Sequence, residues 1–115
     1  MANINKVAIG TNTYDIEDAT ARSLVSEEFT FTVTYSGGTV GTRGFQSSQN
    51  IEKSGYTPIS AVITYVGSST SYNPVAFLGS SDTLVYCNAY RCTTSAVSNS
   101  SIKVRVTYAP NDLFA

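Results

Sequence analysis

Side chains that could do nucleophilic or acid–base chemistry are scarce in this 115-residue chain. It contains no His, which excludes Ser–His–Asp triads and Cys–His pairs, because both use an imidazole as the base. The lysines available as bases for its many serines are Lys6, Lys53 and Lys103. Lys6 and Lys103 lie in strand-like runs and are typical of solvated edge charges, although a Ser–Lys pair stays open. We therefore expect no enzymatic activity.

Carboxylates gather at the front of the chain rather than in pairs across a fold. Five of the eight surround one short segment: Asp15, Glu17, Asp18, Glu27 and Glu28. A glycosidase needs two carboxylates set roughly 5–10 Å apart across a cleft. The β region that follows keeps only Glu52 and Asp82, and Asp112 lies in the tail. Asp82 beside Ser hydroxyls is a single carboxylate, too few for a Ca²⁺ site. The cluster indicates solvation of a helix, and we expect no metal and no cofactor.

Cys87 and Cys92 are the two thiols of the chain. If the run YCNAYRC is one strand, they lie about 16 Å apart at ~3.3 Å per residue. A disulfide needs Cα atoms within about 7 Å. We expect both thiols to be reduced and to serve as small, buried apolar side chains.

Composition narrows the class of protein further. The chain is 42% hydrophobic and only 13% charged, with a net charge of −1. Its basic residues are scattered, which argues against nucleic acid as a partner. No apolar run approaches the ~20 residues of a membrane span, and the first ten residues lack the apolar stretch of a signal peptide. We expect a protein made in the cytoplasm with no membrane partner.

The front of the chain predicts a small hairpin and then a short helix. Val7 and Ile9 alternate with Lys6 and Ala8, a Gly-containing turn follows, and Tyr14 and Ile16 resume the alternation. From there YDIEDATARS continuing to Val25 predicts about three helical turns, with an Asp as the cap. A helix this short is marginal alone in water, so it needs a partner surface.

The rest of the chain alternates with period two and predicts a mainly β protein. Phe29, Phe31, Val33 and Tyr35 share one face of the clearest strand. We predict six strands, at about 28–35, 39–45, 59–67, 74–79, 83–92 and 101–109. Their spacing favours an antiparallel β-sandwich or jelly roll. The expected organisation is a hairpin-plus-helix segment at 1–27, a β knob at 28–110 and a tail at 111–115, with 46–58 as a loop and 59–67 as a central strand.

Eight Tyr and five Phe exceed what so small a β domain can hide. Tyr56, Tyr72 and Tyr90 are therefore candidates for an exposed contact surface, since Tyr is favoured where one end of a side chain is dry and the other wet. Three interpretations stay open: decoration of strand edges, self-association, or a ligand surface.

Two runs resemble known proteins. The segment TYDIEDATAR resembles the T-Y-D-I-x-D-A-x-A-R segment of virion appendage proteins of tailed bacteriophages, of the tail-fibre and head-fibre type, where it often precedes a trimeric β-rich tip. Later, GYTPIS, YCNAYRC and IKVRVTY resemble the terminal β domain of such proteins, in the same order. The chain lacks their long shaft, so it is closer to a miniature fibre or a capsid decoration protein.

The resemblance implies a homotrimer with the front helix near the threefold axis. Small residues there would let three copies approach closely. The expected interface residues are Ala19, Ala21, Leu24 and Val25.

The expected function is that of a non-enzymatic virion structural protein, a short trimeric fibre or decoration protein displayed on the particle. Its partners would be capsid or tail proteins, and its location the virion. The loops at 46–56, 68–73 and 93–100 carry Ser, Thr, Asn and Tyr, which suit contact with a host-surface glycan. The alternative is a bacterial carbohydrate-binding or adhesion module, against which the absence of Trp and of a secretion signal counts.

Overall fold

The computed structural model describes residues 6–9, 12–15, 23–67 and 70–114. At the front, β1 (Lys6–Ile9) and β2 (Asn12–Asp15) pair antiparallel, with Lys6 opposite Asp15 and Ile9 opposite Asn12. This confirms the predicted hairpin. The middle of the predicted helix, residues 16–22, lies outside the described residues.

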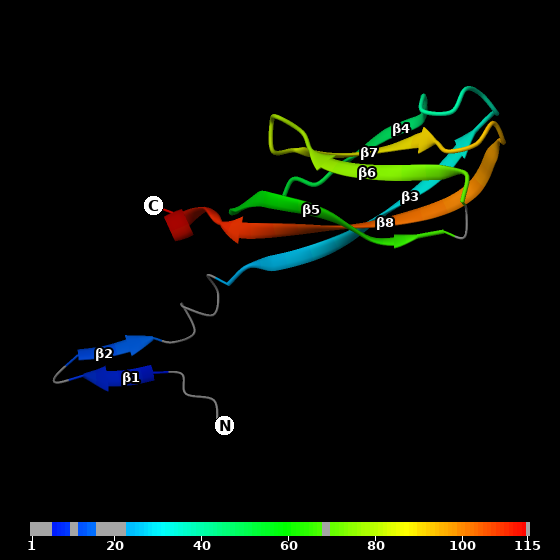
Figure 1. Ribbon diagram of the computed structural model, residues 1–115. Helices are drawn as coiled ribbons and strands as arrows, with labels where there is room; N and C mark the ends of the chain where they lie inside the picture. The colour runs from blue at the N-terminus through cyan, green and yellow to red at the C-terminus, as the bar shows by residue number, and fades with distance from the viewer. Residues whose placement is uncertain (1–5, 10–11, 16–22, 68–69, 115) are drawn as a thin grey trace.

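Six further strands form two antiparallel three-stranded sheets (Figure 1). The strands are β3 (Val25–Tyr35), β4 (Arg43–Asn50), β5 (Tyr56–Val66), β6 (Tyr72–Leu78), β7 (Leu84–Arg91) and β8 (Val97–Pro110). One sheet has the order β3-β8-β5 and the other β4-β7-β6. The β6–β7 hairpin is the one direct connection within a sheet; the other four successive pairs cross from sheet to sheet. The prediction of a mainly β, antiparallel protein is confirmed.

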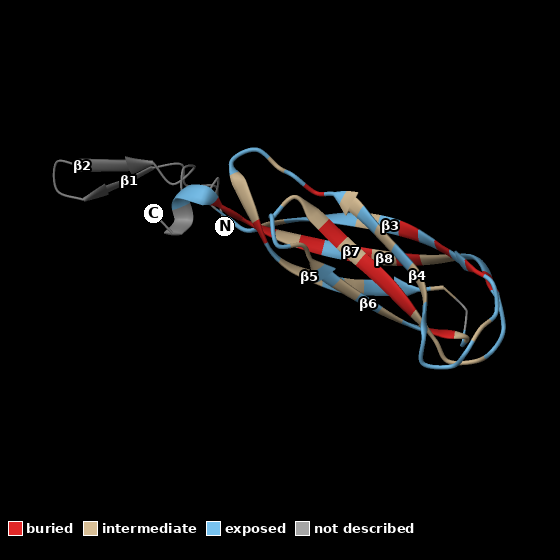
Figure 2. Ribbon diagram, turned by 90° about the horizontal axis from the view of Figure 1, so that it is seen from above, coloured by how far each residue is buried: buried red, intermediate tan, exposed pale blue. Residues whose placement is uncertain are grey.

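The core lies between the two sheets because each strand buries alternate side chains. In β3 and β8 these include Phe31, Val33, Ile102 and Val104, and all are essentially inaccessible to water. The facing sheet contributes a run from β7, namely Val85, Cys87 and Ala89. Figure 2 shows this buried band along the middle of both sheets. Each large aliphatic side chain buried in this way stabilises the fold by roughly 1.5–3 kcal/mol.

The end of the predicted helix is wrong. Val25 begins strand β3 and pairs with Tyr108, and Leu24 before it is exposed. Val25 and Phe29 pack against the core, and from Phe29 every second residue points inward, so tertiary burial outweighs the weak preference of this short segment for a helix. The β region therefore starts at Val25 rather than at residue 28.

Two strand predictions need correction. Strand β4 (Arg43–Asn50) overlaps the strand predicted at 39–45 only at residues 43–45 and continues into the segment expected to be a loop, because its polar residues pair with β7 at a sheet edge. The apolar strand β5 is an edge strand, not a central one, and the central strand of its sheet is β8. Its outward residues Val62 and Tyr65 remain exposed.

Within the predicted tail, one short 3₁₀ helix spans Asn111–Phe114. Cys87 and Cys92 are free thiols as expected, although Cys92 is only partly buried. Within the described ranges no helix is long and apolar enough to cross a membrane.

Candidate functional site

A hollow of about 480 Å³ opens at one end of the two sheets. We call this the far end, because β3 finishes there at Tyr35, whereas the chain enters β3 at Val25 at the opposite, entry end. The hollow lies among the end of β5, the segment that leads into β6 and the first residues of β8. Its lining residues are Tyr65, Gly67, Thr70, Ser71, Ala96, Val97, Ser98, Asn99, Ser100 and Ser101. Its volume is within the range of small-molecule sites.

The lining of this hollow is polar but uncharged. Five of its side chains are hydroxyls of Ser or Thr, one is the amide of Asn99, and one is the Tyr65 ring, which is half exposed. Hydroxyl and amide groups both donate and accept hydrogen bonds. The hollow therefore suits a neutral ligand rich in hydroxyl groups, such as a sugar, better than an ion.

Internal contacts hold the backbone of the hollow in place. The Asn99 backbone has φ of 56°, a left-handed conformation that Asn tolerates, and its N–H donates to Thr34 Oγ1 at 3.3 Å. The Tyr72 hydroxyl and Ser100 Oγ are 2.6 Å apart. Gly67 is needed for space, since a Cβ there would lie 2.6 Å from Ser100 Oγ.

Arg91 ties the neighbouring loops of the far end together. Its Nη1 donates to Thr42 Oγ1 at 2.7 Å and to the Arg43 carbonyl at 3.0 Å. Its guanidinium lies 5.1 Å from the centre of the Tyr35 ring, a cation–π contact. The Tyr35 hydroxyl donates to the Ser71 carbonyl at 3.2 Å, which links this clamp to the wall of the hollow.

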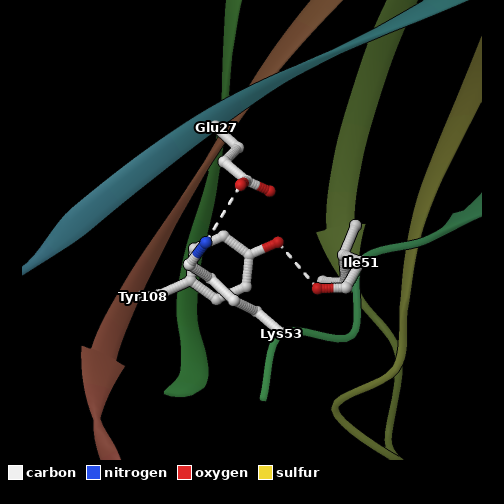
Figure 3. A network of polar contacts seen from close by, with 4 residues as sticks. All are labelled: Glu27, Ile51, Lys53 and Tyr108. Carbon is white, nitrogen blue, oxygen red and sulfur yellow. Dashed lines mark hydrogen bonds and ion pairs between the residues drawn. The ribbon is translucent and has the colours of Figure 1, made fainter. Parts of the chain in front are cut away.

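A second polar network lies toward the entry end (Figure 3). Lys53 forms an ion pair with Glu27 at 3.1 Å, and its Nζ lies 6.0 Å from the Tyr108 ring centre. The Tyr108 hydroxyl donates to the Ile51 carbonyl at 2.7 Å. Every polar group of this network faces a partner from its own chain, which indicates a structural role in fixing the β4–β5 connection.

Among the described residues, burial shifts the pKa of three groups, and none of them lines the hollow. It raises the pKa of the Cys87 thiol to about 11. It also raises the pKa of Tyr108, with a further increase from nearby Glu27. Burial likewise raises the pKa of Tyr35, against the lowering effect of the Arg91 charge. In all three cases the raised pKa favours the neutral, protonated form of the side chain, as expected of core residues rather than of catalysts.

The predicted contact residues Tyr56, Tyr72 and Tyr90 do not form one surface. Tyr72 is buried, so its expected exposure is wrong: it points inward opposite Arg91, where its hydroxyl meets Ser100. Tyr56 is partly buried at the entry end, with Lys53 over its ring at 5.5 Å. Tyr90 is partly buried on the outer face of the other sheet.

Parts of two of the three predicted contact loops, 68–73 and 93–100, line the hollow together, which the sequence analysis did not predict. Residues 72–73 and 97–100 of these predicted loops belong to β6 and β8. The 46–56 segment does not, since Gln46 to Asn50 belong to β4 and Ile51 lies beside Tyr108. Sequence reasoning missed Tyr65, whose place in an apolar strand gave no signal that it borders a polar hollow.

Of the predicted trimer residues, Ala19 and Ala21 lie outside the described residues. Leu24 is exposed just before β3, and Val25 packs partly against the core of its own chain. Val25 thus begins a strand rather than ending a helix, and its expected place at a subunit interface stays a prediction.

Comparisons with family models, curated proteins and solved structures found no match to this chain. In the part of the chain that the structure describes, no group of three or more Cys, Asp or Glu side chains could hold a metal ion. The choice of the hollow at the far end as the candidate site therefore rests only on the chemistry of its lining residues.

Proposed function

We propose that this chain is a non-enzymatic structural protein of a tailed-bacteriophage particle. It is a short homotrimeric fibre or decoration protein whose β-sandwich, jelly-roll-like knob is displayed outward. Its partners are further copies of itself and the capsid or tail proteins of the virion. The sequence resemblance in the front segment and in the later β runs supports this assignment to a virion.

The observation that carries the displayed role is the position of the hollow. It lies at the far end of the sheets, whereas the front segment joins the knob at the entry end. A knob attached through its front segment, with Ala19, Ala21 and Leu24 near the other copies, would thus present its hydroxyl-lined hollow away from the particle. The ligand that best fits this chemistry is a neutral sugar of a host-surface glycan.

A second candidate function is a bacterial carbohydrate-binding or adhesion module. The same hollow favours it, because a neutral, hydroxyl-lined site would bind sugar whether or not a virion carries it. The two proposals differ in location, and that difference can be measured.

Labelling of phage particles with an antibody to this chain, viewed by electron microscopy, tests the virion assignment. We expect label at regular positions on head or tail. Particles that carry none of the protein would contradict the assignment, and sugar binding by the isolated protein would then favour the second function.

Glycan binding by the purified chain tests the hollow. Ser98 lines it and is exposed, so Ser98→Trp fills the hollow and should abolish binding to neutral sugars. Ser80 is equally an exposed serine but lies at the opposite end of the sheets, so Ser80→Trp should bind normally. Equal binding by the two variants would remove the hollow as the site.

A further inference from the structure

The carboxylates of the β knob gather toward one of its ends. Glu27 and Glu28 lie near the start of β3, and Glu52 lies in the β4–β5 connection. Asp82 lies in the β6–β7 connection, and Asp112 follows β8. All five positions belong to the entry half of the sheets. In residues 23–67 and 70–114, therefore, no carboxylate lies at the far end.

Strand pairing fixes which end these connections occupy. The start of β5 at Tyr56 is opposite Pro110, beside the pairing of Val25 with Tyr108 that defines the entry end. The Ile51 N–H donates to the Thr83 carbonyl at 2.9 Å, which joins the β4–β5 and β6–β7 connections at that same end. The loops between β3 and β4, β5 and β6, and β7 and β8 lie at the opposite end (Figure 1).

The far end carries two arginines. Arg43 begins β4 and Arg91 ends β7, and Arg91 Nη1 donates to the Arg43 carbonyl. Neither guanidinium forms an ion pair with any carboxylate in the described part of the chain. Arg91 is partly buried and held over the Tyr35 ring, whereas Arg43 is exposed. The far end is thus positively charged, and Arg43 is the cation that it presents to solvent.

The other cations of the knob lie beside acids. Lys53 forms an ion pair with Glu27. Lys103 Nζ lies 3.8 Å from the Glu28 carboxylate, and Arg105 is opposite Glu28 across the strands. The net charge of the chain is −1, so net charge alone would weakly repel an anionic polymer. Attraction of such a polymer depends on the uneven distribution of charge, which directs it to the far end.

We propose that the far end binds a negatively charged glycan, whose phosphate or carboxylate groups lie beside the neutral sugar that occupies the hollow. Guanidinium groups bind both of these anions through paired, charge-assisted hydrogen bonds. Tyr35 joins the two parts of the site: its ring contacts Arg91, and its hydroxyl donates to the Ser71 carbonyl in the wall of the hollow. Because a glycan carries sugar and anion on neighbouring units, one chain can engage the hollow and Arg43 together.

This inference rests on the proposed function, and it adds an orientation to the displayed knob. An anionic surface attracts the far end with Arg43 and Arg91 and repels the entry end with its five carboxylates. The knob would therefore approach such a surface with the hollow first. That direction agrees with attachment to the particle through the front segment.

Binding of the full wild-type chain to three forms of one polymer tests the proposal. The probes are unmodified dextran, dextran phosphate and carboxymethyl dextran, which share a sugar and differ in charge. At low salt we expect at least one charged form to bind about tenfold more tightly than dextran, and the form that does so identifies the anion. Raising NaCl from about 20 mM to about 500 mM should remove most of this difference, because salt screens exposed charges. Equal binding of all three forms would overturn the proposal.

Two exposed arginines provide a matched pair of variants. Arg43→Gln removes a charge at the far end, and Arg105→Gln removes one beside Glu28 on β8. Both variants have the same net charge. We expect Arg43→Gln to raise the dissociation constant for the charged dextran about fivefold or more, because a charge-assisted hydrogen bond is lost, and Arg105→Gln to leave it within about twofold. Equal effects would show that only net charge matters and would overturn the proposal.

The inference and the proposed function can fail separately. Loss of neutral-sugar binding in Ser98→Trp, with no effect of Arg43→Gln on any dextran, would keep the hollow and remove the arginines. Charged-dextran binding that responds to Arg43→Gln but not to Ser98→Trp would keep the arginines and remove the hollow. Single-stranded DNA that binds as tightly as the charged dextran would overturn the assignment of the partner as a glycan.

Discussion

At the scale of single residues, Tyr108 joins the core to the polar network at the entry end. Its ring is fully buried, while its hydroxyl donates to the Ile51 carbonyl at 2.7 Å. We expect Tyr108→Phe to lower the free energy of unfolding by about 1–2 kcal/mol, because the buried carbonyl loses this donor. Urea denaturation measures the change. Tyr65→Phe, at an exposed ring, is the control and should be nearly neutral; equal losses would mean that the buried hydrogen bond is not the cause.

The thiol of Cys87 should make stability depend on alkaline pH. Burial raises its pKa from 9.0 to about 11, so between these values the unfolded chain loses a proton that the folded chain keeps. The contribution of this thiol to the free energy of unfolding is therefore fully present below pH 9. It is lost as the pH rises toward 11, by an amount on the order of 2 kcal/mol. The raised pKa of Tyr108 acts in the same direction.

Urea midpoints measured from pH 8 to 11 check this prediction. Cys87→Ala should be less stable at neutral pH because it leaves a small cavity, but it should lose less stability over the alkaline range. The same alkaline loss in the variant and the wild type would assign the effect to other groups.

At the scale of elements, strand order decides which apolar residues matter. Ile102 on central strand β8 is completely buried, whereas Ile59 on edge strand β5 is 45% exposed. We expect Ile102→Ala to cost about 2–5 kcal/mol and Ile59→Ala to stay within about 0.5 kcal/mol. Thermal or urea unfolding compares them, and similar losses would mean that Ile59 is as buried as Ile102, contrary to an edge position for β5.

The alternation of β3 and β8 was readable from the sequence because each has one buried and one wet face. Phe31 and Val33, like Ile102 and Val104, mark the buried faces correctly. Strand β4 was not readable, since its run QSSQN is polar on both faces and its pairing with β7 supplies what its side chains do not indicate. Strand β5 led to the opposite error. Its sequence is apolar on both faces and so predicts a central strand, but the strand lies at the edge of its sheet.

At the scale of the whole molecule, the subunit number can be measured directly in solution. The proposed homotrimer has three times the 12.3 kDa mass of the chain. We expect sedimentation equilibrium to give that mass for the wild type. A mass of one chain at all concentrations would contradict the trimer.

The sequence by itself determined the class of this protein: mainly β and antiparallel, with buried faces that period-two alternation marks and without the His that common nucleophilic sites require. Only the tertiary structure decided that Tyr72 is buried, that β5 is an edge strand, and that residues as far apart in the chain as Tyr65 and Ser101 line one hollow. The physical reason is that alternation is a local property of a strand, whereas strand order and loop convergence depend on contacts between residues far apart in the chain. The same Tyr can be buried or exposed according to the strand that lies beside it.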